Sequence, residues 1–256
     1  MGREVIEAAV DRADLSVVAA VNRTPTEAVA GVDVADAGDL PTLLDERTPD
    51  VLVDFTGPES SVECVEAGAD AGVAAVVGTT GFDESDHEAL RTASESTPVL
   101  LASNFSRGVA ALRRAVREAV AALPGYDVEL TETHHNGKRD APSGTAKTIL
   151  DDLDEVRGDS ARQRTGDEAG ARRVHGREGI QPREDGEIGV HARRAGDVTG
   201  EHEVLIAGNH ELVSVTHRAQ DRGVFAAGAL DAAVWLAGRD PGWYDFGRVL
   251  DQDQSA

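Results

Sequence analysis

The chain has few residues of several kinds, and each shortage excludes a class of protein. Cys64 is the only cysteine among 256 residues, so an intrachain disulfide and a cysteine-rich metal site are both excluded. No apolar run approaches the ~20 residues that a membrane-spanning helix needs, and the first residues lack the apolar stretch of a signal peptide. We therefore expect a cytoplasmic protein with no membrane partner.

Basic residues are scarce as well. The chain has 25 Lys and Arg residues against 47 Asp and Glu residues, which gives a formal net charge of -22. This charge repels phosphate backbones and anionic membranes, so nucleic acid is not expected as a partner. Only Lys138 and Lys147 are lysines, and an acidic surface with arginine as its main cation resembles adaptation to high salt. The alternative is an ordinary soluble protein that is acidic.

The first hundred residues alternate between short Val- and Leu-rich runs and segments of helical period. This alternation predicts a Rossmann-like, doubly wound α/β domain, in which helices cover a parallel sheet. The expected strands are 15–21, 51–55, 73–77 and 98–102, and the expected helices lie near 4–13, 59–71, 83–95 and 107–122. Each strand ends in a polar or glycine-containing turn, where such folds bind ligands. The alternative for any single turn is that it is only solvated.

The pattern changes after about residue 125. Apolar residues there alternate with polar ones, as in a strand with one solvated face, and a charged stretch without clear period at 154–187 predicts long surface loops. Together with two later strands and an Ala-rich helix, this predicts an α+β domain with a mixed sheet, responsible for substrate binding and oligomerisation. The expected strands are 187–193 and 203–215, the helix is 224–237, the second domain is 106–216, and the dinucleotide-binding domain is 1–105 and 217–256.

The densest cluster of reactive side chains runs from Glu132 to Ala146, between a strand and a helix. Gly137 and Pro142 keep its middle irregular, so that its histidines and lysine can converge from a loop. Imidazoles exchange protons near neutral pH, and a lysine supplies a cation or a proton, which suits acid–base chemistry on an anionic substrate. The turn Ser143-Gly144-Thr145 offers hydroxyls and N–H groups at the positive end of a helix, which suits a carboxylate.

The cluster has two other interpretations. A metal site is not expected, because no carboxylate or third histidine has a familiar ligand spacing and adjacent histidines on an extended chain point to opposite faces. Lys138 could be a chance surface lysine. Its presence in a chain with so few lysines favours instead a need for a compact ammonium that arginine would not satisfy.

The cluster, written Glu-x-His-His-x-x-Lys-x-Asp-Ala-Pro-Ser-Gly-Thr-Ala, closely resembles the signature of the 4-hydroxy-tetrahydrodipicolinate (dihydrodipicolinate) reductase family. The resemblance covers nearly the whole chain. Further matching segments occur in the family's order: Asp54-Phe-Thr56, Gly78-Thr-Thr-Gly-Phe82-Asp83, Asn104-Phe105-Ser106-x-Gly108, Gly196-Asp197-x-x-Gly200-Glu201-His202 and Trp235-Leu236-x-Gly238.

The resemblance implies roles for individual residues. His134 would be the acid–base group and Lys138 the proton donor. His135, Gly144 and Thr145 would bind a cyclic dicarboxylate substrate. The residues implied to bind the cofactor are Met1, Arg23, Gly78, Thr79, Thr80, Ala102, Ser103, Asn104 and Phe105.

The resemblance also implies the reaction and the assembly. The reaction would be NAD(P)H-dependent reduction of 4-hydroxy-tetrahydrodipicolinate in the diaminopimelate route to lysine, by a homotetramer. The family's acidic ribose-binding residue is replaced by Asn22, beside Arg23, and the lack of a carboxylate that would repel a 2′-phosphate favours NADPH, with NADH possible. Two alternatives remain: another two-domain amino-acid or imine dehydrogenase, and a non-catalytic dinucleotide-binding protein.

The start of the chain departs from the family. Met1-Gly2-Arg3 matches only the end of the glycine-rich turn that receives the pyrophosphate in a dinucleotide fold. The resemblance therefore implies that the first strand and most of that turn are missing, and that cofactor binding is impaired.

We predict that the midpoint of thermal unfolding rises between low and molar salt. Screening shortens the reach of repulsion between surface carboxylates to ~3 Å at 1 M salt, which stabilises a strongly acidic folded chain. Melting curves followed by circular dichroism measure the midpoint. A midpoint that does not move would mean that the acidic composition is not an adaptation to salt.

Overall fold

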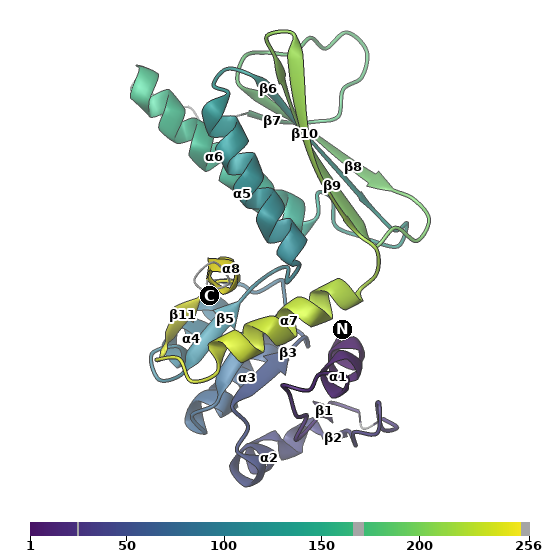
Figure 1. Ribbon diagram of the computed structural model, residues 1–256, viewed down its shortest axis with the longest axis vertical. Coiled ribbons are helices and arrows are strands. Elements are labelled where there is room, and N and C mark those ends of the chain that lie inside the picture. The colour runs from purple at the N-terminus through teal and green to yellow at the C-terminus, as the bar shows by residue number, and fades with distance from the viewer. Residues whose placement is uncertain (25, 166–171, 252–256) are drawn as a thin grey trace. The chain divides into compact units, whose positions relative to one another are not determined.

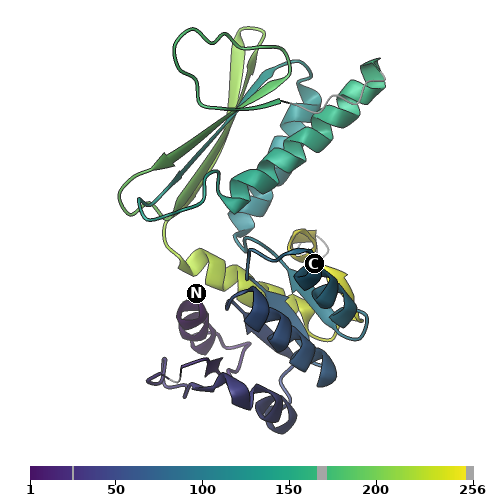
Figure 2. The same ribbon diagram turned by 180° about the vertical axis from the view of Figure 1, so that it is seen from behind.

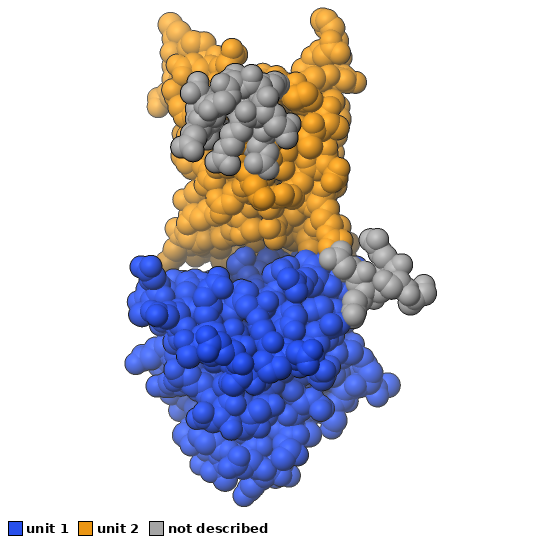
Figure 3. Space-filling model, turned by 90° about the vertical axis from the view of Figure 1, so that its left-hand side faces the viewer, with its two compact units in different colours: residues 1–107, 222–256 blue, residues 108–221 orange. Residues whose placement is uncertain are grey.

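The computed structural model describes residues 1–24, 26–165 and 172–251. The chain forms two compact units (Figure 3). Unit 1 consists of Met1–Arg107 and Arg222–Ala256, and unit 2 of Gly108–Asp221. Unit 1 is thus built from both ends of the chain, and unit 2 from its continuous middle.

Unit 1 contains a parallel sheet with helices on both faces (Figures 1 and 2). In the described residues its strand order is β11-β5-β4-β3. The strands are β3 (Val51–Asp54), β4 (Ala74–Val77), β5 (Pro98–Leu101) and β11 (Gly242–Tyr244). A separate parallel pair is formed by β1 (Val21–Asn22) and β2 (Ala35–Asp36). The helices are α1 (Gly2–Val10), η1 (Ala37–Asp39), α2 (Leu40–Arg47), α3 (Pro58–Asp70), α4 (Glu84–Ala93), α7 (Gly223–Leu236) and α8 (Gly247–Asp251).

Alternating strand residues supply the two cores of unit 1, because successive side chains of a strand point to opposite faces. On one face, Ala75, Val77 and Val99 pack with residues of α3 and α4. On the other, Val53 packs with residues of α1 and α7. The predicted doubly wound arrangement is confirmed.

Small residues let α7 pack closely on the loop that follows β5. A Cβ added at Gly228 would overlap the carbonyl oxygen of Phe105, so the helix backbone sits almost directly on that loop. Ala226, Ala229 and Ala232 are fully buried beside it. Such close packing adds dispersion contacts between the helix and the loop, and it leaves no room for a larger side chain at Gly228.

The expected strand at 15–21 is only partly formed. Val21 and Asn22 pair with β2, and the carbonyl of Ala20 accepts from the amide of Ala35 at 2.9 Å, whereas residues 15–19 belong to no strand. Leu15 and Val17 nevertheless pack against the core shared by α1 and α7. The apolar pattern of residues 15–21 therefore predicted correctly that side chains are buried there. A strand also needs a neighbouring strand to which its backbone can hydrogen-bond, and burial alone does not provide one.

Unit 2 is a mixed sheet whose one face is covered by α5 and α6 (Figures 1 and 2). Its strand order within the described chain is β10-β9-β6-β8-β7, with β7, β8 and β6 parallel and β9 antiparallel to both β6 and β10. The elements are α5 (Arg107–Ala122), β6 (Asp127–His134), α6 (Gly144–Thr165), β7 (Arg172–His175), β8 (Glu187–Arg194), β9 (Gly200–Gly208) and β10 (Glu211–Ala219).

The side chains under the helices form rows across β8, β6 and β9. The first row is Ile188, Val128 and Ile206, and the second is Val190, Leu130 and Val204. All six side chains are buried at or below 3 % exposure. By the same register, the third row is Ala192, Glu132 and His202, and His134 lies beside Arg194. The core therefore changes from apolar to polar along β6.

The predicted loop at 154–187 is wrong over much of its length. α6 continues to Thr165, and Arg172–His175 form the edge strand β7; residues 166–171 of the predicted loop lie outside the described residues. The charged side chains that concealed this structure are engaged in ion pairs, such as that of Arg173 with Asp151 and Asp154. Such pairs let a segment with few apolar residues remain regular.

No helix of the described residues is long and apolar enough to cross a membrane.

Candidate functional site

In unit 1, the loops that follow β4 and β5 leave the same edge of the sheet. The amide of Gly78 donates to the carbonyl of Asp54 at 2.8 Å, and the amide of Ala102 donates to the carbonyl of Val77 at 3.0 Å. The ladder therefore continues into both loops. It brings the predicted cofactor residues 78–80 and 102–105 to one edge, where a parallel sheet presents its ligand site.

A buried carboxylate organises this edge, and the predicted site residues did not include it. Asp54 is 3 % exposed. One oxygen accepts from the amide and hydroxyl of Thr56, at 3.1 and 2.6 Å, and the other accepts from the hydroxyls of Ser61 and Thr79, at 2.5 and 2.7 Å. Four donors satisfy the buried group, as a buried charge requires. Asp54 thereby ties the 78–80 loop to the first turn of α3.

The ring of Phe105 is part of the core instead of the loop surface. It is 1 % exposed and packs edge-on against Phe55 and Phe246. Phe55 also lies against Gly78, where any side chain would overlap its ring. Contact between Phe105 and a ligand at this edge would therefore involve its backbone.

The remaining cofactor candidates lie elsewhere in unit 1. Arg23 follows β1 and is exposed, with its guanidinium Nη2 3.4 Å from the Ser60 hydroxyl on the first turn of α3. Met1 caps α1, and its terminal amine lies 3.0 Å from a carboxylate oxygen of Glu4. That pair lowers the pKa of Glu4 below its usual value.

In unit 2, His134 ends β6 and is held by the carboxylate two residues before it. His134 Nδ1 lies 2.5 Å from Glu132 Oε2. The Glu132 side chain has no exposed surface, and Arg194 binds it with two N–H groups, at 2.8 and 2.7 Å. A two-pronged guanidinium–carboxylate pair of this kind is strong and directional.

Burial and charge act in opposite directions on this pair. Burial disfavours ionised Glu132, but the hydrogen bonds from Arg194 and His134 outweigh it and hold its pKa below the usual value. For His134, burial disfavours the imidazolium and lowers the pKa, with Glu132 offsetting part of the effect. The imidazole is therefore neutral at neutral pH, and it becomes protonated only at a pH below that at which a histidine ordinarily titrates.

A second histidine joins this group to the start of α6. His202 is 3 % exposed, and its Nε2 lies 3.1 Å from the hydroxyl oxygen of Ser143. Burial lowers the pKa of His202 to about 4, so it is neutral at neutral pH. The Ser143 oxygen also accepts from the amide of Ala146 at 3.2 Å, the capping bond of a helix N-terminus, which contributes about 1 kcal/mol.

The loop between β6 and α6 carries the other predicted residues. Lys138 Nζ lies 2.8 Å from Asp140 Oδ1. Burial opposes ionisation of Asp140, but the ammonium outweighs it and lowers the pKa of that carboxyl. Gly144 and Thr145 form the first turn of α6, with open space beside Gly144. Unit 2 thus gathers all five residues predicted for catalysis and substrate binding in one short segment.

Sequence reasoning missed Glu132, Arg194 and His202 as parts of this group. Glu132 carried a signal, because residues two apart on a strand share a face and Glu132 stands two before His134. The other two lie about sixty and seventy residues further along the chain. Their approach depends on the register of β8 and β9 against β6, which their own segments do not reveal.

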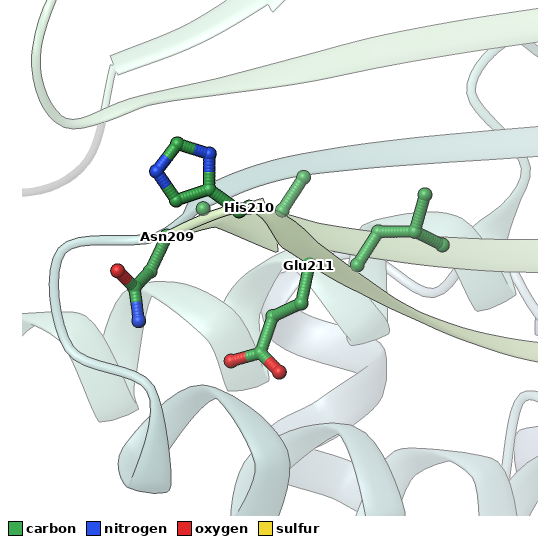
Figure 4. A pocket seen from close by; sticks show the side chains of 6 residues that line it. Asn209, His210 and Glu211 are labelled. Carbon is green, nitrogen blue, oxygen red and sulfur yellow. The ribbon is translucent and has the colours of Figure 1, made fainter.

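The hollow that the described residues form lies away from this group. A hollow of about 480 Å³ is lined by residues 207–212, including Asn209, His210 and Glu211, at the turn between β9 and β10 (Figure 4). This is the opposite end of β9 from His202, and it contains none of the predicted site residues. Among the described residues, no group of three or more His, Cys, Asp or Glu side chains is arranged to hold a metal ion.

Comparison with known proteins gives consistent matches along the chain. The family model described as dihydrodipicolinate reductase, N-terminus, matches residues 1–105, and the model for the C-terminus matches residues 108–250. The 4-hydroxy-tetrahydrodipicolinate reductase of Natronomonas pharaonis is 58% identical over 96% of this chain and 94% of its own. That of Haloarcula marismortui is 53% identical over 98% of this chain and 95% of its own.

Among solved structures, the dipicolinate-bound dihydrodipicolinate reductase from Paenisporosarcina sp. superimposes with a TM-score of 0.77, at 24% identity, over 96% of this chain and 94% of that chain. At this identity the likeness shows the fold. The two family models, by contrast, together account for nearly every residue. The chain belongs to the dihydrodipicolinate reductase family.

Proposed function

We propose that this chain is an oxidoreductase that reduces 4-hydroxy-tetrahydrodipicolinate to tetrahydrodipicolinate in the diaminopimelate route to lysine. The observation that carries the proposal is the group at the end of β6, where the Glu132–His134 pair, Lys138 and the first turn of α6 occur within one segment. Relatives with this activity in their names are up to 58% identical over almost the whole chain.

The start of α6 suits a dicarboxylate. Backbone N–H groups of a helix's first turn are unpaired within the helix and carry about half a positive charge in sum. Gly144 leaves open space beside these groups. We assign Gly144, Thr145 and His135 to the substrate, with Lys138 as a further cation in a strongly acidic protein.

The proposed reaction is loss of water from the cyclic 4-hydroxy imine, followed by addition of a hydride to the conjugated C=C–C=N system. A bound nicotinamide dinucleotide supplies the hydride. Lys138 stabilises the negative charge that arrives with it and donates a proton. His134, neutral at neutral pH because burial lowers its pKa, exchanges protons through the ring nitrogen that does not face Glu132.

The carboxyl edge of the unit 1 sheet fits a nicotinamide dinucleotide. It offers the 78–80 and 102–105 loops, which Asp54 and the continued ladder hold in place. Arg23 adds an exposed cation after β1, and no carboxylate accompanies it because Asn22 takes that position. We therefore propose NADPH as the preferred cofactor and NADH as a weaker one, with Met1 at the start of α1 near the pyrophosphate position.

Two other functions compete with this proposal. An amino-acid or imine dehydrogenase would share the two-unit plan, and a non-catalytic dinucleotide-binding protein would share unit 1. The buried polar row under α6, formed by Glu132 and His202, favours the reductase over the second, because a binding protein has no need of a histidine that is held by a carboxylate itself paired with an arginine. We further infer a cytoplasmic location, consistent with the single, half-buried Cys64.

We predict that Lys138→Ala and His134→Gln each lower turnover by roughly 10²–10⁴-fold, the usual loss for a general acid or base. The assay follows NADPH absorbance while a synthase forms the unstable substrate in place. Lys147→Ala is the matched control, since Lys147 is the other lysine of the chain and is exposed on α6. Near-normal turnover of both site variants would contradict the assignment.

We predict that Arg23→Ala weakens NADPH binding more than NADH binding, because only NADPH carries the phosphate that a guanidinium grips. Titration of both cofactors, followed by quenching of protein fluorescence, gives the two dissociation constants. Arg47→Ala, an exposed arginine at the end of α2, serves as the control. Equal losses for the two cofactors would remove the phosphate role.

We predict a homotetramer assembled through unit 2. Helices α5 and α6 cover one face of its sheet, while the edge strand β10 exposes Leu212 and Val213, at 65% and 37%. Exposed apolar residues on a long edge strand are typical of an interface. Light scattering should give the mass of four chains, and a monomeric mass would refute the assembly.

A further inference from the structure

The polar row at the end of β6 connects parts of unit 2 that are distant in sequence. Glu132 continues the face that carries Val128 and Leu130, so its carboxylate lies under the helices and not in solvent. Its four hydrogen bonds reach β6 itself, β8 and the start of α6. They come from His134 Nδ1, two Arg194 nitrogens and the Ser143 amide.

We propose that Glu132, held by Arg194, is a positioning residue that keeps the proton of neutral His134 on Nδ1 and leaves Nε2 as the nitrogen that exchanges protons with substrate. The proposal rests on the acid–base role proposed above for His134. It extends that role by naming the two residues that determine which ring nitrogen reacts.

The direction of the hydrogen bond follows from the chemistry of its partner. An ionised carboxylate only accepts hydrogen bonds, so the nitrogen 2.5 Å from Glu132 Oε2 must carry the proton. In the neutral ring this leaves a lone pair on Nε2. That side of the ring faces Gly200, where a Cβ would lie 3.2 Å from Nε2, so a side chain at this position would crowd that nitrogen.

Arg194 keeps Glu132 ionised and in place. Besides its two bonds to the carboxylate, its guanidinium donates to the carbonyls of Asp140 at 2.6 Å and Arg193 at 2.7 Å. The guanidinium is thus held from both the loop and β8. Without it, a carboxylate with no exposed surface would take up a proton and could then donate to Nδ1, which would reverse the tautomer.

The same carboxylate also fixes the proposed substrate site. Glu132 Oε1 accepts from the Ser143 amide at 3.1 Å, directly before the first turn of α6. The acid–base histidine and the anion-binding turn therefore share one anchor. Productive geometry in catalysis depends on such shared positioning, because displacements of about 1 Å can cost 10²-fold in rate.

The first test is spectroscopic and needs no substrate. Nitrogen NMR of the full-length, unliganded chain with labelled histidines distinguishes Nδ1–H from Nε2–H rings, and loss of a signal in His134→Gln assigns His134. We expect the Nδ1–H tautomer in the wild-type protein. The Nε2–H tautomer there would overturn the proposal without reference to any variant.

The second test is Glu132→Gln, whose amide can donate to Nδ1 and carries no charge. We expect the His134 tautomer to change, kcat to fall by roughly 10²-fold or more with a smaller change in KM, and the pH at which His134 titrates to fall. The last effect follows because Glu132 favours the imidazolium. The other charged or titratable groups near His134 are Arg194 on β8, His202 on β9 and Lys138 in the loop, and Lys138 is itself paired with Asp140.

Glu129→Gln is the matched control. Glu129 lies on the same strand and also binds a histidine and an arginine, with His191 Nε2 at 2.7 Å and Arg183 as partners, but on the opposite face of the sheet. We expect kcat and the His134 signals to be unchanged in this variant. An unchanged tautomer in Glu132→Gln, with kcat within about twofold of the control, would overturn the proposal.

Removing one partner of a buried ion pair can unfold a protein, so the double variant Glu132→Gln with Arg194→Gln provides a second route. It removes both charges together, and we expect the same change of tautomer. A wild-type chain that shows the Nδ1–H tautomer but no reductase turnover would refute the proposed function alone. If the wild-type chain is active but the His134 tautomer is the same with and without the Glu132 carboxylate, the positioning role alone would be refuted.

Discussion

The pairing of Glu132 with Arg194 is the constraint on which the organisation of unit 2 depends. A carboxylate with no exposed surface is tolerated only when it is paired and hydrogen-bonded, and loss of one partner of such a pair costs about 3–5 kcal/mol. This requirement brings together the end of β6, the end of β8, the loop carbonyl of Asp140 and the amide of Ser143. A single buried charge therefore holds the residues of a candidate catalytic centre at one place.

The apolar rows beneath that centre explain why it can be polar. Two complete rows of Ile, Val and Leu across β8, β6 and β9 precede it along β6, and each buried side chain of this kind contributes roughly 1.5–3 kcal/mol. The third row can then place Glu132 and His202 under the first turn of α6. Unit 1 follows the same principle with a single carboxylate, Asp54, which accepts four hydrogen bonds at the end of β3.

The sequence predicted the periodic elements well. The expected helix at 107–122 is confirmed as Arg107–Ala122, and the strands at 51–55, 73–77 and 98–102 are confirmed within a residue or two, because buried parallel strands are continuous apolar runs. The candidate residues from His134 to Thr145 could be named because they are contiguous. The prediction of a loop at 154–187 was wrong because the regular structure there depends on ion pairs, such as Arg173 with Asp154, that no local sequence pattern reveals. Arg194 and His202 were not predicted as site residues because the register of their strands against β6 brings them to Glu132.

The discontinuous construction of unit 1 has a consequence for the order in which the chain acquires structure. α7 and β11 follow unit 2 in the sequence, yet α7 packs on β3 and β4, and β11 is paired with β5. During synthesis, more than a hundred residues are added after residue 107 before the helix and strand that complete the sheet of unit 1 are made. Unit 2 is contiguous and can fold in that interval. Its polar row would then be assembled before the dinucleotide-type sheet of unit 1 is closed.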